Sequence, residues 1–312
     1  MDVLVREYRP ADAEPVSALL REVHPYLVMS PQLVHAQVTG APARQHYRML
    51  VAQDAGRITG CARAGLFADN SDPGPAFANV SVRSADRRRG AGSALLAAAE
   101  AHLAAIGATT SYAWANDEPG SSAFAERHGY RPGRSAGFLR LDLAADGPLP
   151  PAPAPAPGVR LLPAALWADD PRPLYEADLE CIRDEPGDVA ADDISYADWR
   201  SVTWDRPDFD AELTTVAVVD GEVAGLVIAQ TDGAGRYWSG GTGVRRAFRG
   251  LGLAKAAKAR SLHVARTLGY REAFTGNDDG NAPMLAVNSW LGYLPCGAER
   301  RYLRDLPPAP AS

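Results

Sequence analysis

Hydrophobic runs with strand-like alternation recur in pairs along the chain and predict β-hairpins. The runs at 47–54 and 57–66 flank an Ala-Gly turn, and those at 213–219 and 223–230 flank an Asp-Gly turn. Glycine adopts the positive φ angles of such short turns at no steric cost. A further apolar run follows each pair and leads into a segment rich in arginine and glycine. Each half of the chain is therefore predicted to contain a hairpin of antiparallel strands followed by a third strand.

A helical period replaces the strand period after each glycine-rich segment. Between residues 90 and 106 the apolar positions are Leu95, Leu96, Ala99, Leu103 and Ile106. Their spacing places them on one face of an α-helix, and the glycine that follows is a common helix end. The stretch 253–268 repeats this pattern. A strand, a short helix and a last strand are then predicted in each half, so the expected fold class is α+β with a mixed sheet.

The two halves are copies of one unit. VRSADRRRGAGSALLAAAEAHLAAIGA begins at Val82, and VRRAFRGLGLAKAAKARSLHVARTLGY begins at Val244, 162 residues later. At this offset Arg87 pairs with Arg249, Gly90 with Gly252, Gly92 with Ala254, and Gly107 with Gly269. Further on, Gly-Tyr at 129–130 pairs with Gly-Tyr at 292–293. A repeat of this length indicates a duplicated domain.

A proline-rich stretch separates the copies. ADGPLPPAPAPAPG runs from Ala145 to Gly158, and its proline and small residues favour an extended chain that packs no core. The chain of 312 residues has room for two domains of about 150 residues each. We therefore expect a first domain at 1–144, a linker at 145–157, a second domain at 158–306 and a tail at 307–312.

Charge and composition exclude several classes of partner. The formal net charge of −6 gives no basic surface for nucleic acid, which needs clustered positive charge. No run approaches the roughly 18 apolar residues of a transmembrane helix, and the opening lacks the apolar core of a signal peptide. We expect a cytoplasmic protein without a membrane partner. Cys61, Cys181 and Cys296 lie far apart, so no metal site is predicted.

The glycine-rich segments have the composition of a pyrophosphate site. Glycine lets the backbone approach a phosphate closely, and the unpaired N–H groups of a helix's first turn bind an anion. Arg87, Arg88 and Arg89 add positive charge in the first copy, whereas Arg249 stands almost alone in the second. No Gly-Lys-Ser/Thr follows, and Gly-x-Gly-x-x-Gly is absent from both segments. The pattern therefore favours a nucleotide-linked carrier bound without a metal.

Both segments resemble the signature of the GCN5-related N-acetyltransferase (GNAT) superfamily. That signature, Arg/Gln-x-x-Gly-x-Gly/Ala, cradles the pyrophosphate of acetyl-CoA in the family, and it is matched at 87–92 and 249–254. The resemblance covers about residues 3–143 and 159–306. It implies two tandem GNAT-like domains, each a mixed, mostly antiparallel sheet flanked by helices, with acetyl-CoA as the acyl donor.

The resemblance also implies a set of cofactor contacts. Val82 and Val244 fall at the end of the strand whose splayed backbone pairs with the pantetheine arm in the family. Asn277 and Asn281 fall in its second cofactor-contacting segment. The implied cofactor-binding residues are Val82, Arg87, Arg88, Arg89, Gly90, Ala91, Gly92 and Ser93 in the first copy, and Val244, Arg249, Gly250, Leu251, Gly252, Leu253, Ala254, Asn277 and Asn281 in the second.

The family mechanism is direct transfer, in which a neutral amine attacks the thioester and the thiolate leaves. Many members carry a tyrosine that serves the leaving thiolate, but this chain has Ala125 and Asn288 at that position. Asn288 is a candidate catalytic residue because its amide can donate a hydrogen bond, although an asparagine that lines a helix fits equally well. No general base is identifiable, and the carboxylates nearest in sequence are typical of solvated loops: Asp69, Glu185, Asp232 and Asp278.

The expected activity is acetyl-CoA-dependent N-acetyl transfer to a small-molecule amine. We expect the second copy to be catalytic, because its segment NDDGNAPMLAVNSWLGY matches the family more fully. Two alternatives stay open. One is an acetyltransferase similar to the mycothiol synthases, from which Asn288 departs, and the other is an acyl-CoA-binding sensor or scaffold without turnover. The acceptor and the oligomeric state stay undetermined at this point.

Overall fold

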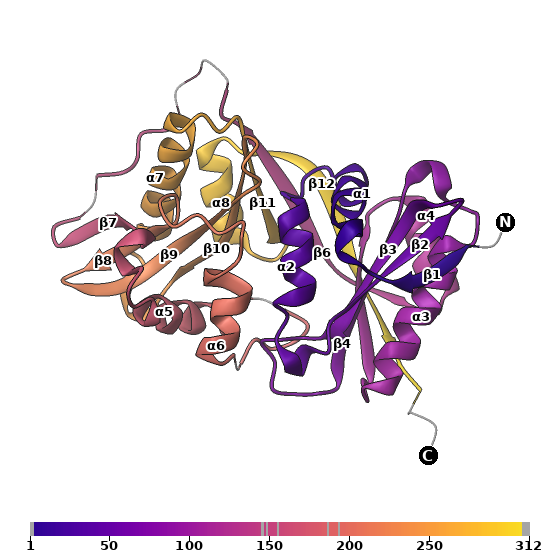
Figure 1. Ribbon diagram of the computed structural model, residues 1–312. Coiled ribbons are helices and arrows are strands. Elements are labelled where there is room, and N and C mark those ends of the chain that lie inside the picture. Colours follow the sequence, from indigo (N-terminus) through magenta and orange to yellow (C-terminus); the bar gives the residue numbers. More distant parts are fainter. Residues whose placement is uncertain are drawn as a thin grey trace. The chain divides into compact units, whose positions relative to one another are not determined.

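The computed structural model describes residues 3–144, 147, 149–154, 156–185, 187–192 and 194–307 (Figure 1). Contacts within the chain divide it into two units, one of residues 1–136 with 298–312 and one of residues 137–297. The expected linker and tail lie partly outside the described residues. In the described part of the chain, no helix is long and apolar enough to cross a membrane.

The first unit is a sheet with helices on both faces. Its strands follow the order β1-β2-β3-β4-β5-β12, and all these neighbours are antiparallel except β4 and β5. The elements are β1 (Leu4–Glu7), α1 (Ala13–Val23), α2 (Pro31–Thr39), β2 (Arg48–Asp54), β3 (Arg57–Leu66), β4 (Pro75–Val82), α3 (Ala91–Ala105), β5 (Thr110–Asn116), α4 (Pro119–Arg127), β6 (Arg131–Asp142) and, from the chain's other end, β12 (Leu294–Asp305).

The second unit repeats this plan with the strand order β6-β11-β10-β9-β8-β7. Its elements are β7 (Val159–Pro163), α5 (Arg172–Ile182), α6 (Tyr196–Trp199), β8 (Thr215–Val219), β9 (Glu222–Thr231), β10 (Arg236–Val244), α7 (Leu253–Thr267), β11 (Glu272–Asp278) and α8 (Ala282–Leu291). Here β10 and β11 are the parallel pair. Both predicted hairpins and both predicted long helices are confirmed.

The period-two pattern of the strands separates two cores in the first unit. Leu50 and Ala52 of β2 pack with Leu95 and Ala99 of α3. Their neighbour Val51 packs instead with the helices α1 and α2. Successive side chains of a strand point to opposite faces of its sheet, so one strand supplies both cores. Figure 1 shows α3 on one side of these strands and α1 with α2 on the other.

The last strand of each copy contributes to the other unit. Residues 131–136 of β6 belong to the first unit and 137–142 to the second, whereas β12 enters the first unit from residue 298 onward. There β12 pairs with β5, from Glu299 opposite Asn116 to Asp305 opposite Thr110. The domain ends expected at 144 and 306 therefore do not coincide with the units.

Both exchanged segments carry core residues with them. Tyr302 of β12 is 1% exposed and packs in the core beneath α3. Leu141 of β6 and the adjacent Leu143 pack in the core beneath α7. Each unit therefore takes both a strand and core side chains from the other copy's sequence.

We expect a fragment of residues 1–144 to lose the cooperative fold of the first unit. It would lack the strand that pairs with β5 and the buried ring of Tyr302, and losing a buried aromatic side chain alone costs about 3–5 kcal/mol. Circular dichroism melts of this fragment measure the effect, with residues 145–312 co-expressed as a separate chain in the control. A cooperative melt of the isolated fragment at the full-length temperature would contradict the expectation.

Candidate functional site

The parallel strands β4 and β5 pair at one end only and then separate. Pairing extends from Pro75 opposite Thr110 to Phe77 opposite Tyr112, although β4 continues to Val82 and β5 to Asn116. Beyond the paired residues the two strands face each other with backbone groups that no ladder satisfies. The resulting V-shaped opening, here called the V, suits an extended ligand that can pair with backbone.

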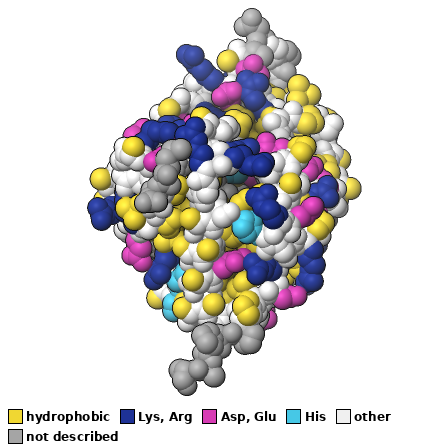
Figure 2. Space-filling model, turned by 90° about the vertical axis from the view of Figure 1, so that its right-hand side faces the viewer, with side chains coloured by type: hydrophobic (Ala, Val, Ile, Leu, Met, Phe, Trp, Pro, Cys, Tyr) yellow, Lys and Arg dark blue, Asp and Glu magenta, His cyan; other side chains and the backbone are white. Residues whose placement is uncertain are grey.

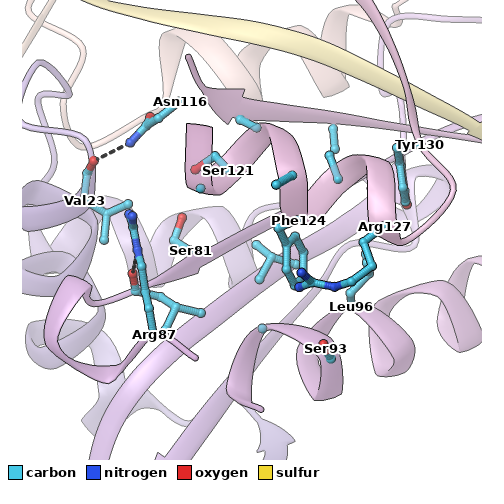
Figure 3. Close-up of a pocket in the computed structure, with 18 of the residues that line it drawn as sticks. Val23, Ser81, Arg87, Ser93, Leu96, Asn116, Ser121, Phe124, Arg127 and Tyr130 are labelled. Atoms are coloured by element: carbon cyan, nitrogen blue, oxygen red, sulfur yellow. Dashed lines mark hydrogen bonds between the residues drawn. The ribbon is translucent and has the colours of Figure 1, made fainter. Parts of the chain in front are cut away.

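A cavity of about 720 Å³ occupies the V of the first unit. This volume lies within the range of ligand sites. Figure 3 shows that Leu96 of α3 and Phe124 of α4 approach the cavity from different helices, with Ser81 of β4 nearby. The lining includes Ala78, Val80 and Val82 of β4, Ala113, Trp114, Ala115 and Asn116 of β5, and Ala125 and Tyr130. The walls are therefore largely apolar.

One end of this cavity is suited to an anion. Helix α3 begins at Ala91, and its N-cap residue Gly90 has a φ of 91° and provides no side-chain cap for the first-turn N–H groups. Arg87, Arg88 and Arg127 also line the cavity. Uncapped N–H groups and nearby cations together bind phosphate. Figure 2 views the face that lies on the right of Figure 1 and shows basic side chains interspersed with acidic and hydrophobic ones, so any anion site on it is local.

Most of the expected residues of the first copy come together here. Val82, Arg87, Arg88, Gly90, Gly92 and Ser93 line the cavity. Arg89 lies 3.7 Å from Asp86, and Ala91 packs in the core. A β-carbon on Gly92 would lie 3.2 Å from the ring of Phe124, so glycine leaves this ring more room.

The second unit repeats the V with fewer cations. β10 and β11 pair only where Arg236–Trp238 lies opposite Glu272–Phe274. Helix α7 begins at Leu253, and its N-cap residue Gly252 has a φ of 71° and provides no side-chain cap. Arg249 donates to the carbonyl of Val244 at 3.1 Å and forms an ion pair with Asp184. At the positions of Arg88 and Arg89 this copy has Gly250 and the half-exposed Leu251.

Strand β10 carries a bulge that β4 lacks. Ser239 lies opposite Ala229 and Thr242 opposite Val227, so two residues of β10, Gly240 and Gly241, face one residue of β9. β4 pairs with β3 without a register shift from Val82 to Ala76. A bulge removes a backbone group from the ladder and is common beside active sites.

Asp178 of α5 faces this bulge. It is 7% exposed, its Oδ2 accepts a hydrogen bond of 2.8 Å from the indole of Trp199, and a β-carbon on Gly241 would lie 3.9 Å from its Oδ1. Burial raises the pKa of Asp178 to about 6. This carboxylate could not be predicted from a sequence pattern, because it lies in a helix far upstream of β10 with no motif around it.

A buried polar chain joins α7, β11 and α8 of the second unit. Lys258 donates to Asn288 Oδ1 at 2.6 Å and to Thr275 Oγ1 at 3.3 Å, and Asn288 Nδ2 donates to Asn277 Oδ1 at 2.5 Å. Lys258 is 1% exposed, and burial lowers its pKa to about 7. At the matching positions the first copy has Leu96 and Ala125, which line the cavity. The two copies thus fill the same place with different chemistry.

The remaining expected residues have local roles. Asn281 caps α8 by accepting a hydrogen bond of 3.3 Å from Met284 N, and Leu253 packs in a core. Ala254 follows it in the first turn of α7. Asp232 and Asp278 accept backbone hydrogen bonds within their own turns. These contacts support a local structural role for both carboxylates and give no evidence that either is a general base.

Comparison with known proteins gives one family for both halves. A model described as "Acetyltransferase (GNAT) domain" matches residues 45–132, and one described as "Acetyltransferase (GNAT) family" matches residues 173–293. A protein of Actinosynnema mirum named mycothiol acetyltransferase is 28% identical over 302 residues, which cover 94% of this chain and 96% of that protein. Its namesake in Geodermatophilus obscurus is 37% identical over 145 residues, 45% of each chain.

Two solved structures share the fold over nearly the whole chain. A GCN5-related N-acetyltransferase from Sphaerobacter thermophilus has a TM-score of 0.72 at 22% identity, covering 98% of this chain and 96% of its own. A tandem GNAT protein from the clavulanic acid biosynthesis pathway has a TM-score of 0.71 at 22% identity, covering 98% and 99%. The tandem arrangement of two such units is thus found in a solved structure.

We expect Gly90→Asp to weaken the binding of coenzyme A to the first unit by about 10-fold or more, because it brings a carboxylate to the anion end of the cavity. Gly107→Asp is the matched control, since Gly107 also has a positive φ of 80° and open space around its α-carbon but lies at the far end of α3. Calorimetry of coenzyme A binding compares the two variants. Equal losses of affinity would show that backbone strain, and not charge, is responsible.

Proposed function

The chain belongs to the GNAT family and carries two of its domains in tandem, which makes it an N-acetyltransferase, and on this premise we propose that its second unit transfers acetyl from acetyl-CoA directly to a small-molecule amine. The observation that carries the proposal is the bulge of β10, with Asp178 at the bulge and Lys258 hydrogen-bonded to Asn288. The first unit is then a second acetyl-CoA site.

In this proposal acetyl-CoA lies in the V of the second unit. Its pyrophosphate binds the uncapped N–H groups at the start of α7. Its pantetheine arm runs along the unpaired edge of β10, as the family resemblance implies. The thioester oxygen then lies at the bulge, where a backbone N–H outside the ladder can stabilise the oxyanion.

Asp178 serves as the general base. Its Oδ1 is directed toward Gly241 of the bulge, while Trp199 holds Oδ2. A carboxylate with a raised pKa accepts a proton more readily than an ordinary aspartate, and a catalytic pKa near the operating pH is favourable. Asp178 takes the proton from the amine as nitrogen attacks the acetyl carbon.

Lys258 and Asn288 serve the leaving thiolate. The family position of the tyrosine is Asn288, whose Oδ1 accepts from the Lys258 ammonium. Lys258 thereby adds a positive charge that an asparagine alone lacks, and a lysine with a pKa near 7 can give up its proton readily. In this proposal, Lys258 together with Asn288 replaces the tyrosine that serves the leaving thiolate in many family members.

The relatives favour one class of acceptor. The Actinosynnema mirum protein, alignable over 94% of this chain, is named for mycothiol, so the acceptor of such enzymes is the first amine to test. A panel of amines with a thiol-release assay extends the search. Binding of acetyl-CoA without amine-dependent thiol release from any member would instead favour a sensor or scaffold.

We expect Gly252→Asp to abolish amine-dependent release of coenzyme A, because its carboxylate repels the pyrophosphate in the second unit. The matched variant is Gly90→Asp, which makes the same change at the equivalent glycine of the first unit and should leave a folded protein with substantial transfer to the amine. Initial rates with thiol detection measure both. If the two outcomes are reversed, the transfer to the amine belongs to the first unit.

We expect a bell-shaped pH dependence of kcat/KM. Asp178 must be unprotonated, so the rate rises as pH increases through about 6, and Lys258 must be protonated, so the rate falls as pH increases through about 7. Lys258→Leu, which copies the first unit's Leu96, should remove the alkaline limb and slow transfer by about 10²-fold. A profile unchanged in shape would contradict the role of the lysine.

We expect Asp178→Asn to slow transfer by about 10²-fold or more and yet to stabilise the fold above pH 6. The folded pKa of Asp178 is raised from 3.8 to about 6, so its contribution to stability is full below pH 3.8 and is lost as pH increases through 6. The variant has no ionisable group at this position and so avoids this loss. Its free energy of unfolding should exceed that of the parent by up to about 3 kcal/mol at pH 8 but by little at pH 4. Urea titrations at both pH values provide the measurement, and a variant less stable at pH 8 would contradict it.

A further inference from the structure

Three side chains of the first unit form a hydrogen-bonded chain at the wall of its cavity. His24 Nε2 lies 3.0 Å from Ser81 Oγ, and His24 Nδ1 lies 3.1 Å from Glu299 Oε1. Ser81 is on β4, His24 follows α1, and Glu299 is on β12. Ser81 and His24 both line the cavity. The arrangement is that of a nucleophile, a base and an orienting carboxylate.

Glu299 and Tyr26 lie on the Nδ1 side of the His24 ring. Burial by itself raises the pKa of Glu299, but the hydrogen bond and charge of His24, the hydroxyl of Tyr26 and Arg63 together outweigh it, so the pKa lies below its ordinary value. The Tyr26 hydroxyl donates to Glu299 Oε1 at 2.6 Å. When His24 is neutral with its proton on Nδ1, that nitrogen faces Glu299 Oε1 at 3.1 Å and the Tyr26 hydroxyl at 3.2 Å, and Nε2 can accept from the Ser81 hydroxyl.

We infer that Ser81 takes up the acetyl group of acetyl-CoA in the first unit, with His24 as its base and Glu299 as the residue that positions His24. This inference rests on the proposed binding of acetyl-CoA in that cavity. It adds to the chain a second transfer site, which works through an acetyl-serine, whereas the second unit transfers acetyl directly.

The steps balance without a further reactant. Ser81 Oγ attacks the thioester carbon while its proton passes to His24 Nε2. The bond between carbon and sulfur breaks, and the thiolate takes that proton and leaves as coenzyme A. Water then attacks the acetyl ester, gives a proton to His24 and releases acetate, and Ser81 returns to its hydroxyl form as His24 gives the proton back.

The second unit has no counterpart of this nucleophile. The position equivalent to Ser81 is Gly243, where a β-carbon would collide with Cys181 of α5. Conversely, the first copy has Leu96 and Ala125 in place of the polar pair formed by Lys258 and Asn288. Each copy therefore has one set of reactive side chains, and the two sets differ in kind.

The test uses the full-length chain with Gly252→Asp, so that the second unit does not turn over. The protein is mixed with acetyl-CoA without an amine, quenched in acid and examined by intact and peptide mass spectrometry, while released thiol is followed in parallel. We expect a burst of about one thiol per chain and an acetyl group on Ser81. Ser81→Ala should remove both, whereas Ser17→Ala, a change at another buried serine of this unit, should keep both.

Further variants separate the chemical roles from a structural one. His24→Gln should slow acetylation by at least about 10²-fold. Glu299→Gln should slow it too, and Glu299→Asp should restore part of the rate. p-Nitrophenyl acetate is an acetyl donor that carries no pyrophosphate. With it, the acetylation rates of these variants are expected to rank in the same order.

Calorimetry with coenzyme A distinguishes the two ways in which the experiment can fail. If coenzyme A does not bind the first unit, both the proposed donor site and the acetyl-serine are wrong. If it binds with unchanged affinity in Ser81→Ala but no acetyl group and no thiol burst appear in the parent, the acetyl-serine alone is overturned. If Ser81→Ala leaves thiol release unchanged, the acetyl-serine alone is likewise overturned.

Discussion

The early separation of two parallel strands is the constraint on which both sites depend. Three residues of β4 pair with β5, and three of β10 pair with β11, before each pair diverges. Had the ladders continued, the backbone groups that can hold an extended ligand would have bonded to each other. The V also places the first turn of α3 or α7 near the strand ends, which allows one molecule to reach both an anion site and an open strand edge.

Within this shared backbone, side chains decide what each unit can do. The first unit has small and apolar residues in the V, including Leu96 and Ala125, and retains a cavity of about 720 Å³. The second unit has Lys258 and Asn288 at these positions, joined by a 2.6 Å hydrogen bond. Burying an ammonium group is costly unless it is hydrogen-bonded. This costly group is hydrogen-bonded to Asn288, the residue at the position of the family's acid, and the proposed chemistry gives a reason for burying it there.

Local patterns predicted the elements well, and the long-range assembly poorly. Hairpins, long helices and the glycine-rich turns follow from short-range spacing, and the structure has them where the periodicity indicated. Asp178 and Glu299 could not be found in this way, because each reaches its site from an element far away along the chain. The strand exchange was also hidden, since β6 and β12 share only the pattern aromatic-Leu-Arg, at 138–140 and 302–304, and this pattern does not say which sheet each strand completes.

The exchanged strands have a consequence for how the two copies can change over time. Each unit's sheet needs a strand encoded in the other half of the gene, with Tyr302 serving one core and Leu141 the other. A mutation that disables the chemistry of one half therefore does not free that half to decay, because its strand is still required elsewhere. Selection on folding alone would keep both halves intact while their reactive residues drift apart, which is how one duplicated chain can come to hold two different sets of reactive groups.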